Sequence, residues 1–466
     1  MSLFILLKIL NKIMFFYVIL YKQEGEIMLD TIVALATAPM KSAIAVIRVS
    51  GENCYEIVSK VFSKDLTNKT QKGINYGFIK KNEQVIDEVI VLNYVKPHSF
   101  TGENSVEIMC HGSMLIVNEI IELLVENGAR IATRGEFSSR AYLNGRIDLV
   151  QAEAINDVIN ATSKEAKQLS LLSLEGKTSK LLEPLKTTLA DLISNIEVNI
   201  DYPEYLDIEV VSKEKIITEG SKLHEMIAKL VNEGEEGAKI KDGVNVALVG
   251  KPNVGKSSLL NCLLKEDKAI VTNVAGTTRD VVEGDIVFKG ITLHLFDTAG
   301  LHDSNDEVES LGIKKTKKTI DEADIVVLLL DGENITNEDE ILIKEISHKN
   351  PIIVHSKSDL VKYDEGISIS SKNNDVKQLL NEISKRIGIH EESFIRPSLN
   401  NTRQIGLLKK ADLAIDQAIE DAKNDLPVDL ISVSLVEAYN TILEIMGDNV
   451  NMDLSKEIFS RFCVGK

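Results

Sequence analysis

The sequence predicts a multidomain α/β protein in which an N-terminal α+β domain precedes a helical domain that is split by an inserted α/β domain. Three observations carry this prediction: the length of 466 residues, a hydrophobic period that changes several times along the chain, and a glycine-rich phosphate-loop pattern in the second α/β stretch. At about 150 residues per domain, the length alone suggests roughly three domains.

The composition is that of a folded globular chain, because 44% of the residues are hydrophobic and 27% are charged. Only 8 prolines and 27 glycines exclude a collagen-like or Pro/Gly-rich disordered protein. The four cysteines form no C-x-x-C pair, so neither a disulfide framework nor a cysteine zinc site is indicated, which fits a reducing cytoplasm. The net charge of −18 argues against a surface that coats nucleic acid broadly, although it leaves room for a small local RNA site.

The N-terminal leader, residues 1–27, is treated separately because residues 3–21 are mostly apolar. Lys8, Asn11 and Lys12 interrupt this run and weaken its interpretation as a membrane helix. A signal peptide would need a small-residue cleavage site, which the end of the leader lacks. Three interpretations stay open: a membrane anchor, a targeting segment, or an extension outside the native fold. We favour the last, with translation starting at Met28, and expect a cytoplasmic protein without stable membrane association.

Residues 28–146 are predicted to form the α+β domain. The strand candidates lie at residues 31–36, 43–49, 86–94 and 105–109. Residues 114–127 have helical spacing, and Gly128 follows them as a residue that can end a helix in the left-handed conformation.

Residues 147–240 and 393–466 are predicted to be two parts of one helical domain. In the first part, apolar residues recur at steps of three and four and form a stripe typical of a bundle core: Leu181, Leu185, Leu189, Leu192 and Ile196. The Tyr202-Pro203 pair interrupts this stripe. Residues 400–447 are helical again, with an apolar set made of Ile405, Leu408, Ala411, Leu413 and Ala414.

Residues 241–392 alternate between strand, turn and helix and are predicted to form the inserted α/β domain. A strand candidate at residues 244–249 leads into G-K-P-N-V-G-K-S-S at residues 250–258, which matches the phosphate-loop pattern G-x-x-x-x-G-K-[ST] in its strand-loop-helix context. Backbone N–H groups and the helix N-terminus bind phosphates in such a loop. Lys256 is expected to reach the β- and γ-phosphates, and Ser257 is expected to ligate Mg²⁺.

Two later motifs favour guanine over adenine as the base. D-T-A-G at residues 297–300 ends a strand candidate, so Asp297 would hold Mg²⁺ through water and Gly300 would sense the γ-phosphate. S-K-S-D at residues 356–359 stands where GTPases usually carry N-K-x-D, so its aspartate would accept the guanine N1 and N2 protons, although Ser356 departs from the pattern. S-S-K at residues 370–372 follows as a base-contacting loop.

The residue after D-T-A-G is Leu301, whereas Ras-like enzymes have a glutamine there that orients the attacking water. A leucine side chain cannot do this, so the polar group must come from elsewhere. The acidic segment at residues 303–309 supplies candidates, and it is equally well explained as a solvated loop.

Several independent motifs resemble one known family. V-T-N-V-A-G-T-T-R-D at residues 271–280 resembles the switch I segment of potassium-activated bacterial GTPases. Together with F-T-G-E at residues 100–103, R-G-E-F-S at residues 134–138 and F-C-V-G-K at residues 462–466, it resembles the MnmE (TrmE) family of tRNA uridine-modification GTPases over residues 28–466.

This resemblance implies a folate-binding and dimerisation domain at residues 28–146, followed by the split helical domain and a Ras-like G domain. It implies K⁺-activated GTP hydrolysis and a flavoprotein partner, MnmG (GidA), in a heterotetramer or larger complex. The reaction would build a 5-carboxymethylaminomethyl or aminomethyl group on the wobble uridine of certain tRNAs. The protein would act as a homodimer and take a carbon from 5-formyl-tetrahydrofolate or a related tetrahydrofolate.

The resemblance also implies which residues of the G domain bind each ligand. Catalysis falls to Glu309, Lys256 and Thr278, with Glu309 orienting the water in place of the missing glutamine. The K⁺ ligands are Asn253, Thr272, Val274 and Thr277, and the Mg²⁺ ligands are Ser257 and Thr278. The GTP-binding residues are Asn253, Val254, Gly255, Lys256, Ser257, Ser258, Thr272, Asn273, Val274, Ala275, Gly276, Thr277, Thr278, Asp297, Thr298, Ala299, Gly300, Lys357, Asp359, Ser370, Ser371 and Lys372.

Arg48, Glu107, Arg146 and the C-terminal Lys466 fall at positions where the family binds folate. Their charges suit a ligand that has a glutamate tail and a pterin ring donating hydrogen bonds to a carboxylate. Cys463 is interpreted either as a catalytic thiol or as a small packed side chain, and the second interpretation is favoured.

Two other functions are alternatives. A ribosome-assembly GTPase would carry an RNA-binding domain with a basic face, which the C-terminal helical run and the net charge of −18 do not supply. A membrane-associated G protein would depend on the leader at residues 1–27.

Overall fold

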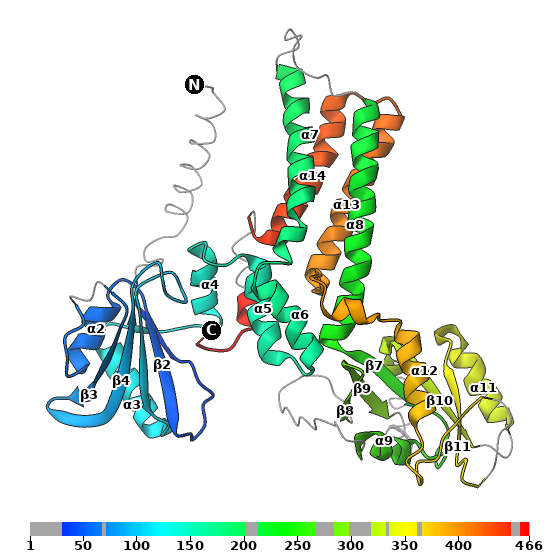
Figure 1. Cartoon of the computed structure of the whole chain (residues 1–466), viewed down its shortest axis with the longest axis horizontal. Helices are drawn as coiled ribbons and strands as arrows, with labels where there is room; N and C mark the ends of the chain where they lie inside the picture. The colour runs from blue at the N-terminus through cyan, green and yellow to red at the C-terminus, as the bar shows by residue number, and fades with distance from the viewer. Residues whose placement is uncertain are drawn as a thin grey trace, which may run out of the picture. The chain divides into compact units, whose positions relative to one another are not determined.

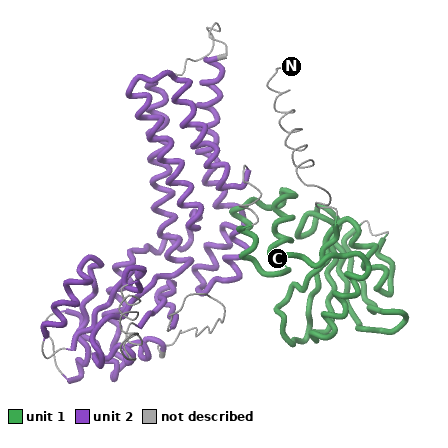
Figure 2. The backbone as a smooth tube through the Cα atoms, turned by 180° about the vertical axis from the view of Figure 1, so that it is seen from behind, with its two compact units in different colours: residues 1–152, 450–466 green, residues 153–449 purple. Residues whose placement is uncertain are grey.

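The computed structural model describes residues 30–67, 71–201, 213–265, 284–297, 318–331, 335–360, 366–448 and 457–465. The chain divides into two compact units, which are residues 1–152 with 450–466, and residues 153–449 (Figure 2). The predicted leader and the Tyr202-Pro203 break lie outside the described residues. Within the described ranges, no helix is both long enough and apolar enough to cross a membrane.

The first unit is built on a six-stranded sheet with the order β3-β4-β5-β2-β1-β6 (Figure 1). Its strands are β1 (Ile32–Leu35), β2 (Ile44–Ser50), β3 (Gly73–Lys81), β4 (Gln84–Tyr94), β5 (Ser105–His111) and β6 (Arg130–Ile131). The β1–β6 pair is parallel, and the other neighbours are antiparallel. The predicted strands correspond to β1, β2, β4 and β5, whereas β3 was not predicted because Gly73 and Gly77 weaken its strand signal.

Helices α2 (Cys54–Val61) and α3 (Met114–Glu126) cover one face of this sheet and bury its core with residues such as Val58 and Ile120. As predicted, α3 ends just before Gly128, which has a φ of 109°. Because side chains alternate along a strand, Arg48 of β2 and Glu107 of β5 point to the other face, where they stand opposite each other in register.

The end of the chain packs into the first unit beside α4 (Glu136–Leu143). Phe459 and Phe462 pack against the first turn of α5 (Leu149–Asn160). Gly135, with a φ of 68°, permits a close approach here, because a Cβ atom on it would lie 2.2 Å from the carbonyl oxygen of Phe459. The prediction of a packed thiol at Cys463 is wrong: this residue is exposed, because Phe462 takes the inward position of the segment.

The helical part of the second unit joins segments from both sides of the insertion (Figure 1). Its further helices are α6 (Lys164–Leu174), η1 (Ser179–Leu181), α7 (Glu183–Asp201), α8 (Lys213–Asp242), α13 (Thr402–Lys423) and α14 (Val428–Met446). Helix α13 packs against α8 and α14, and α14 packs against α7, so the predicted packing of the two segments as one bundle is confirmed. Leu413 was wrongly assigned to the core and is 70% exposed, because Ala411 and Ile415 occupy the inward face of α13.

The α/β part of the second unit has a sheet with the order β12-β11-β10-β7-β9-β8, in which β8 is antiparallel and the other pairings are parallel. Its strands are β7 (Val244–Val249), β8 (Gly284–Phe288), β9 (Ile291–Asp297), β10 (Ile325–Asp331), β11 (Ile352–Ser356) and β12 (Ile367–Ser368). Its helices are α9 (Lys256–Lys265), α11 (Asn337–Ile346), η3 (Ser347–Lys349), α12 (Lys377–Ile387) and η4 (Glu391–Phe394).

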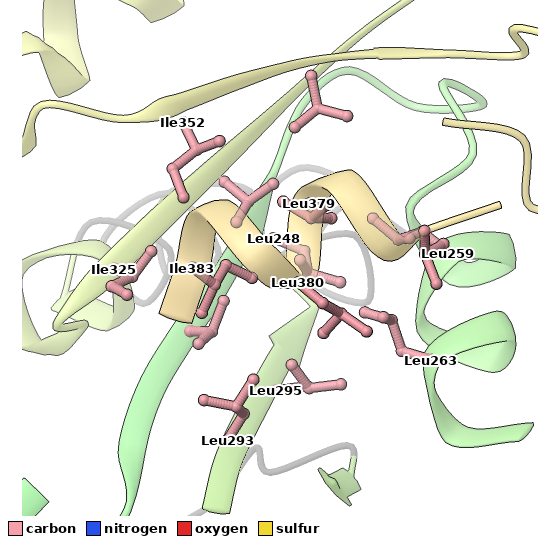
Figure 3. Close-up of a cluster of buried hydrophobic side chains, with 14 of the residues drawn as sticks. Leu248, Leu259, Leu263, Leu293, Leu295, Ile325, Ile352, Leu379, Leu380 and Ile383 are labelled. Carbon is pink, nitrogen blue, oxygen red and sulfur yellow. The ribbon is translucent and has the colours of Figure 1, made fainter. Parts of the chain in front are cut away.

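Helices α9 and α12 cover one face of this sheet, where leucines and isoleucines such as Leu259, Leu295 and Leu380 form the core (Figure 3). Helix α11 covers the other face. Strand β10 is buried along its apolar run, as is typical of a parallel strand with helices on both faces. The loops after β7, β9 and β11 therefore leave the same edge of the sheet, where ligands bind in such folds.

Candidate functional site

The phosphate loop connects the end of β7 to the start of α9. Gly250 is required at its first position, because a Cβ atom there would lie 2.6 Å from the carbonyl oxygen of Leu329. Asn253 has a φ of 65°, in the left-handed region that asparagine adopts more readily than most residues. Helix α9 begins at Lys256, so the free N–H groups of its first turn face the loop. The backbone thus has the form that phosphate binding requires.

The Lys256 side chain is only 4% exposed. Its Nζ donates hydrogen bonds to the carbonyl oxygens of Gly250 and Lys251, both at 2.7 Å. Burial lowers the pKa of this ammonium group. Because both partners are neutral carbonyls, the positive charge of Lys256 is available to an anion that enters the loop.

Ser257 and Asp297 lie next to each other although 40 positions separate them in the chain. The Ser257 Oγ donates a hydrogen bond to Asp297 Oδ2 at 3.0 Å, and Asp297 is almost completely buried at the end of β9. A hydroxyl and a carboxylate oxygen are hard ligands of the kind that Mg²⁺ prefers. These two side chains therefore fit the predicted magnesium site.

The two predicted base-contacting loops also lie together. The Ser370 Oγ donates to Asp359 Oδ1 at 2.9 Å, and Lys357 Nζ donates to Asp331 Oδ2 at 2.6 Å. Ser356 is buried, and its Oγ donates to the carbonyl oxygen of Leu330 at 3.2 Å. Ser356, which stands where GTPases usually have the asparagine of N-K-x-D, thus joins β11 to β10 through this hydrogen bond.

Lys251 connects the phosphate loop to α11, a link that the sequence analysis missed. Its Nζ donates to Asp339 Oδ2 at 2.8 Å and also to the Thr336 hydroxyl. Although burial alone would raise the pKa of Asp339, hydrogen bonds from Lys251 and Thr336 lower it. The sequence signals this region only through T-x-x-D at residues 336–339, a motif typical of the start of a helix, and this motif does not indicate a contact with Lys251.

The remaining predicted residues of this site divide into two groups. Val254 is buried, Gly255 and Ser371 are half-buried, and Ser258 and Lys372 are exposed. The others lie outside the described residues: Thr272, Asn273, Val274, Ala275, Gly276, Thr277, Thr278, Thr298, Ala299, Gly300 and Glu309.

A second site lies in the first unit, where three of the four predicted folate residues line one pocket of about 500 Å³. Arg48 donates to Glu107 Oε1 through Nε at 3.0 Å and Nη2 at 2.8 Å. The Nη1 of Arg48 donates to the carbonyl oxygen of Gly465 at 3.2 Å, so the end of the chain reaches this pocket. Lys466, the fourth predicted residue, lies outside the described residues.

Phe100 separates the two arginines of the pocket. The Arg48 guanidinium lies 4.6 Å from the centre of its ring and the Arg146 guanidinium lies 5.2 Å from it. Arg146 also donates to the carbonyl oxygen of Phe100. Burial and the neighbouring Arg48 lower the pKa of Arg146. Phe100, the first residue of the F-T-G-E segment, thus forms part of the pocket wall.

Arg140 of α4, which follows the R-G-E-F-S segment by two residues and is 3% exposed, joins that segment to F-T-G-E. Arg140 donates to Asp30 Oδ1 at 2.7 Å, to Glu136 Oε1 at 3.1 Å and to Glu103 Oε1 at 3.3 Å. A buried guanidinium needs such partners, so both segments have a structural role besides any contact with a ligand.

Several residues that line the pocket were not predicted from the sequence, among them Lys72, Tyr94 and His98. The Tyr94 hydroxyl donates to Glu107 Oε2 at 3.3 Å. Burial and the Glu107 carboxylate raise the pKa of Tyr94, so its phenol remains a donor at neutral pH. No local pattern marks these residues, because they reach the pocket from separate strands and loops.

A third group of ionisable side chains lies between α8 and α13. His224 Nδ1 is 3.0 Å from Asp412 Oδ1 and 3.2 Å from Asp416 Oδ1. Burial raises the pKa of Asp412, and Asp416 adds to this shift while His224 opposes it. These are hydrogen-bond distances, so the arrangement is explained without a metal ion.

Comparison with known proteins agrees with the motifs. Residues 31–146 match the family described as "GTP-binding protein TrmE N-terminus", and residues 149–463 match "MnmE helical domain". The tRNA modification GTPase MnmE of Bacillus mycoides (strain KBAB4) is 40% identical over 455 residues, which cover 94% of this chain and 99% of the relative. The protein of the same name from Acholeplasma laidlawii (strain PG-8A) is 41% identical over 447 residues, with the same two shares covered.

Among solved structures, the G domain of the T. maritima FeoB iron transporter is 29% identical, with a TM-score of 0.24, and the match covers 31% of this chain and 96% of that one. The family assignment depends instead on the helical-domain match, which spans more than half of the chain, and on relatives that the chain covers almost end to end. This chain is therefore a GTP hydrolase that belongs to the MnmE family of tRNA modification GTPases.

Proposed function

We propose that this chain hydrolyses GTP in a K⁺-activated reaction in the cytoplasm and, with the flavoprotein MnmG, modifies the wobble uridine of certain tRNAs. The product is a 5-carboxymethylaminomethyl or aminomethyl group whose carbon comes from 5-formyl-tetrahydrofolate or a related donor. One observation carries the proposal: the same chain holds a phosphate loop with Lys256 and Asp297 in position and a separate pocket lined by Arg48, Glu107 and Arg146.

The proposal assigns a role to each part of the chain. Residues 28–146 bind folate and form the dimer, and residues 241–392 form the G domain. Residues 147–240 and 393–466, which precede and follow the G domain in sequence, together form the helical domain. A protein with this acidic balance binds tRNA locally, with the help of its partner.

In the G domain, the buried ammonium of Lys256 binds the β- and γ-phosphates of GTP. Ser257 and Thr278 would ligate Mg²⁺, and Asp297 would help to hold the ion through water. Mg²⁺ supplies charge neutralisation on the phosphate oxygens. Glu309 orients the attacking water, and Asp359, which Ser370 holds by a hydrogen bond, accepts the guanine N1 and N2 protons.

Replacing K⁺ by Na⁺ is expected to lower kcat for GTP hydrolysis about tenfold. This is less than the roughly 10²–10³-fold loss in kcat that follows removal of one group that stabilises charge in the transition state, because Na⁺ still supplies a positive charge. Oxygen atoms of Asn253, Thr272, Val274 and Thr277 form the proposed K⁺ site, and the smaller ion fits such a loop less well. The measurement is phosphate release at saturating GTP and Mg²⁺ in matched salts.

Asn253→Gly is the matched variant, because glycine keeps the φ of 65° while it removes the side-chain oxygen. We expect this variant to turn over GTP at the same rate in both salts. Equal rates of the unsubstituted chain in K⁺ and Na⁺ would remove the potassium site from the proposal.

The homodimer is proposed to form through the exposed apolar side of the β3–β4 hairpin. Ile74 and Tyr76 on β3 are 76% and 55% exposed, and Tyr76 stands opposite Ile90 of β4, which is 40% exposed. Contiguous apolar patches are uncommon on the surface of monomers. A second copy of this sheet face would cover these side chains.

Mass spectrometry of tRNA nucleosides tests the whole proposal. Cells that lack this protein are expected to lose the modified wobble uridines, and expression of the chain from Met28 should restore them. If the modified nucleosides persist at their normal level in the deletion strain, the chain acts in another reaction. A chain carrying a defective phosphate loop serves as the control for dependence on GTP.

A further inference from the structure

We propose that the pocket of the first unit selects folates with more than one glutamate, and that Lys72 and Arg146 at its rim bind this anionic tail. This inference rests on the proposed folate function of the pocket. It adds the length of the tail as the property of the ligand that the site recognises.

The floor of the pocket is a nearly neutral, hydrogen-bonding surface. The side chains of Arg48 and Glu107 are 13% and 19% exposed and form an ion pair at 2.8 Å. Arg48 saturates Glu107 Oε1 with two hydrogen bonds, whereas Oε2 receives one from the Tyr94 hydroxyl at 3.3 Å. A carboxylate oxygen can accept about two hydrogen bonds. Oε2 therefore has capacity for an N–H donor of a pterin ring.

The rim of the pocket has a different character, because its exposed members are Lys72, Pro97, His98 and Arg146. Neither Lys72 nor Arg146 forms an ion pair with a carboxylate of the described residues. Lys72 Nζ lies 5.1 Å from the centre of the Tyr94 ring, and Arg146 donates to the carbonyl oxygen of Phe100. The mouth of the pocket therefore has two cations that are not paired with a carboxylate of the described residues. Such a pair of cations fits an anionic group of the ligand.

The charges and the volume together indicate how a folate would lie. Among the described residues that line the pocket, only Glu107 is acidic; it is at the floor, and the cations are at the rim. This places the pterin inside and the glutamate end at the mouth. A volume of about 500 Å³ is that of a site for one small molecule, so glutamates beyond the first would extend across the rim. Each added glutamate brings a further carboxylate to Lys72 and Arg146.

The test is isothermal titration of the full chain with 5-formyl-tetrahydrofolate carrying one glutamate or three. The unsubstituted chain is expected to bind the triglutamate about three- to tenfold more tightly at low salt, the range for one or two partly exposed ion pairs. This preference should shrink at high salt, because exposed charges are screened. Lys72→Ala should bring the ratio of the two dissociation constants close to one, and Lys72→Arg should preserve it.

Lys60→Ala is the matched control, because Lys60 is an exposed lysine of the same unit on α2, which covers the other face of the sheet. It should keep the full preference for the triglutamate. Equal binding of both ligands by the unsubstituted chain, or a preference that survives in Lys72→Ala, would overturn this inference and leave the folate site standing. Absence of binding of either ligand would overturn the folate site itself.

Discussion

Replacing Lys256 with methionine is expected to lower kcat for GTP hydrolysis by about 10²–10³-fold, the cost of removing one group that stabilises charge in a transition state. Lys256 is 4% exposed, and the carbonyl oxygens of Gly250 and Lys251 fix its ammonium group in the phosphate loop. Methionine has a similar length and an apolar body but no charge, so it fills the space without binding phosphate. Phosphate release at saturating GTP, Mg²⁺ and K⁺ measures the effect.

Lys344→Met on α11 is the matched control, because Lys344 is exposed and should leave turnover unchanged. Thermal unfolding of the variant distinguishes a loss of catalysis from a general loss of folding. Methionine removes the cost of burying a charge but also two hydrogen bonds to carbonyl oxygens and the attraction of Asp297, so Lys256→Met should unfold at about the same temperature as the unsubstituted chain. Turnover within tenfold of the unsubstituted chain would show that another group holds the phosphates.

The phosphate loop could be predicted from the sequence because its determinants are local. Gly250, Lys256 and Ser257 lie within a few positions of one another, and the strand before them and the helix after them set their geometry. Asp297 is distant in sequence, but the order of the motifs along the chain predicted its meeting with Ser257, and the hydrogen bond of 3.0 Å fits that prediction.

The pocket of the first unit could not be predicted from the composition, from the hydrophobic periodicity or from the spacing of residues in motifs. Arg48 and Glu107 meet because β2 pairs with β5 in one register, and this pairing follows from the whole sheet. A charged residue on a strand is most often solvated, so the resemblance to a family was needed to select these two. Lys72 and Tyr94 carried no such signal, and only the fold brings them to the same pocket.

The missed strand β3 and the wrong assignment of Leu413 to the core have one physical origin. The hydrophobicity of a residue does not determine whether its side chain points to the core or to the surface. In β3, the apolar residues Ile74 and Tyr76 point to the exposed side, and Gly73 and Gly77 flank them. Leu413 is as apolar as its neighbours in α13 but lies on the outer face of the helix. Tertiary packing decided both cases against the local pattern.

Replacing Glu153 with alanine is expected to lower the free energy of unfolding by about 3–5 kcal/mol, the range for removing one member of a buried ion pair. Glu153 of α5 is 7% exposed and accepts from Arg403 of α13 through Nε at 2.7 Å and Nη2 at 3.0 Å. Gln404 Nε2 also donates to it at 2.7 Å. In the variant, Arg403 would keep only the carbonyl oxygens of Glu444 and Ile445, with no opposite charge. Urea denaturation followed by circular dichroism measures the loss.

The control is an exposed ion pair that also involves α13. Glu235 and Lys409 join α8 to α13 at 2.7 Å, but their side chains are 48% and 55% exposed, so Glu235→Ala should cost less than about 1 kcal/mol. The double variant Glu153→Leu with Arg403→Met should recover most of the loss, because apolar residues of similar volume can replace a whole buried pair. A cost for Glu153→Ala no larger than that for Glu235→Ala would contradict the prediction. Because α5 precedes the G domain and α13 follows it, this pair joins the two segments of the chain between which the GTPase is inserted.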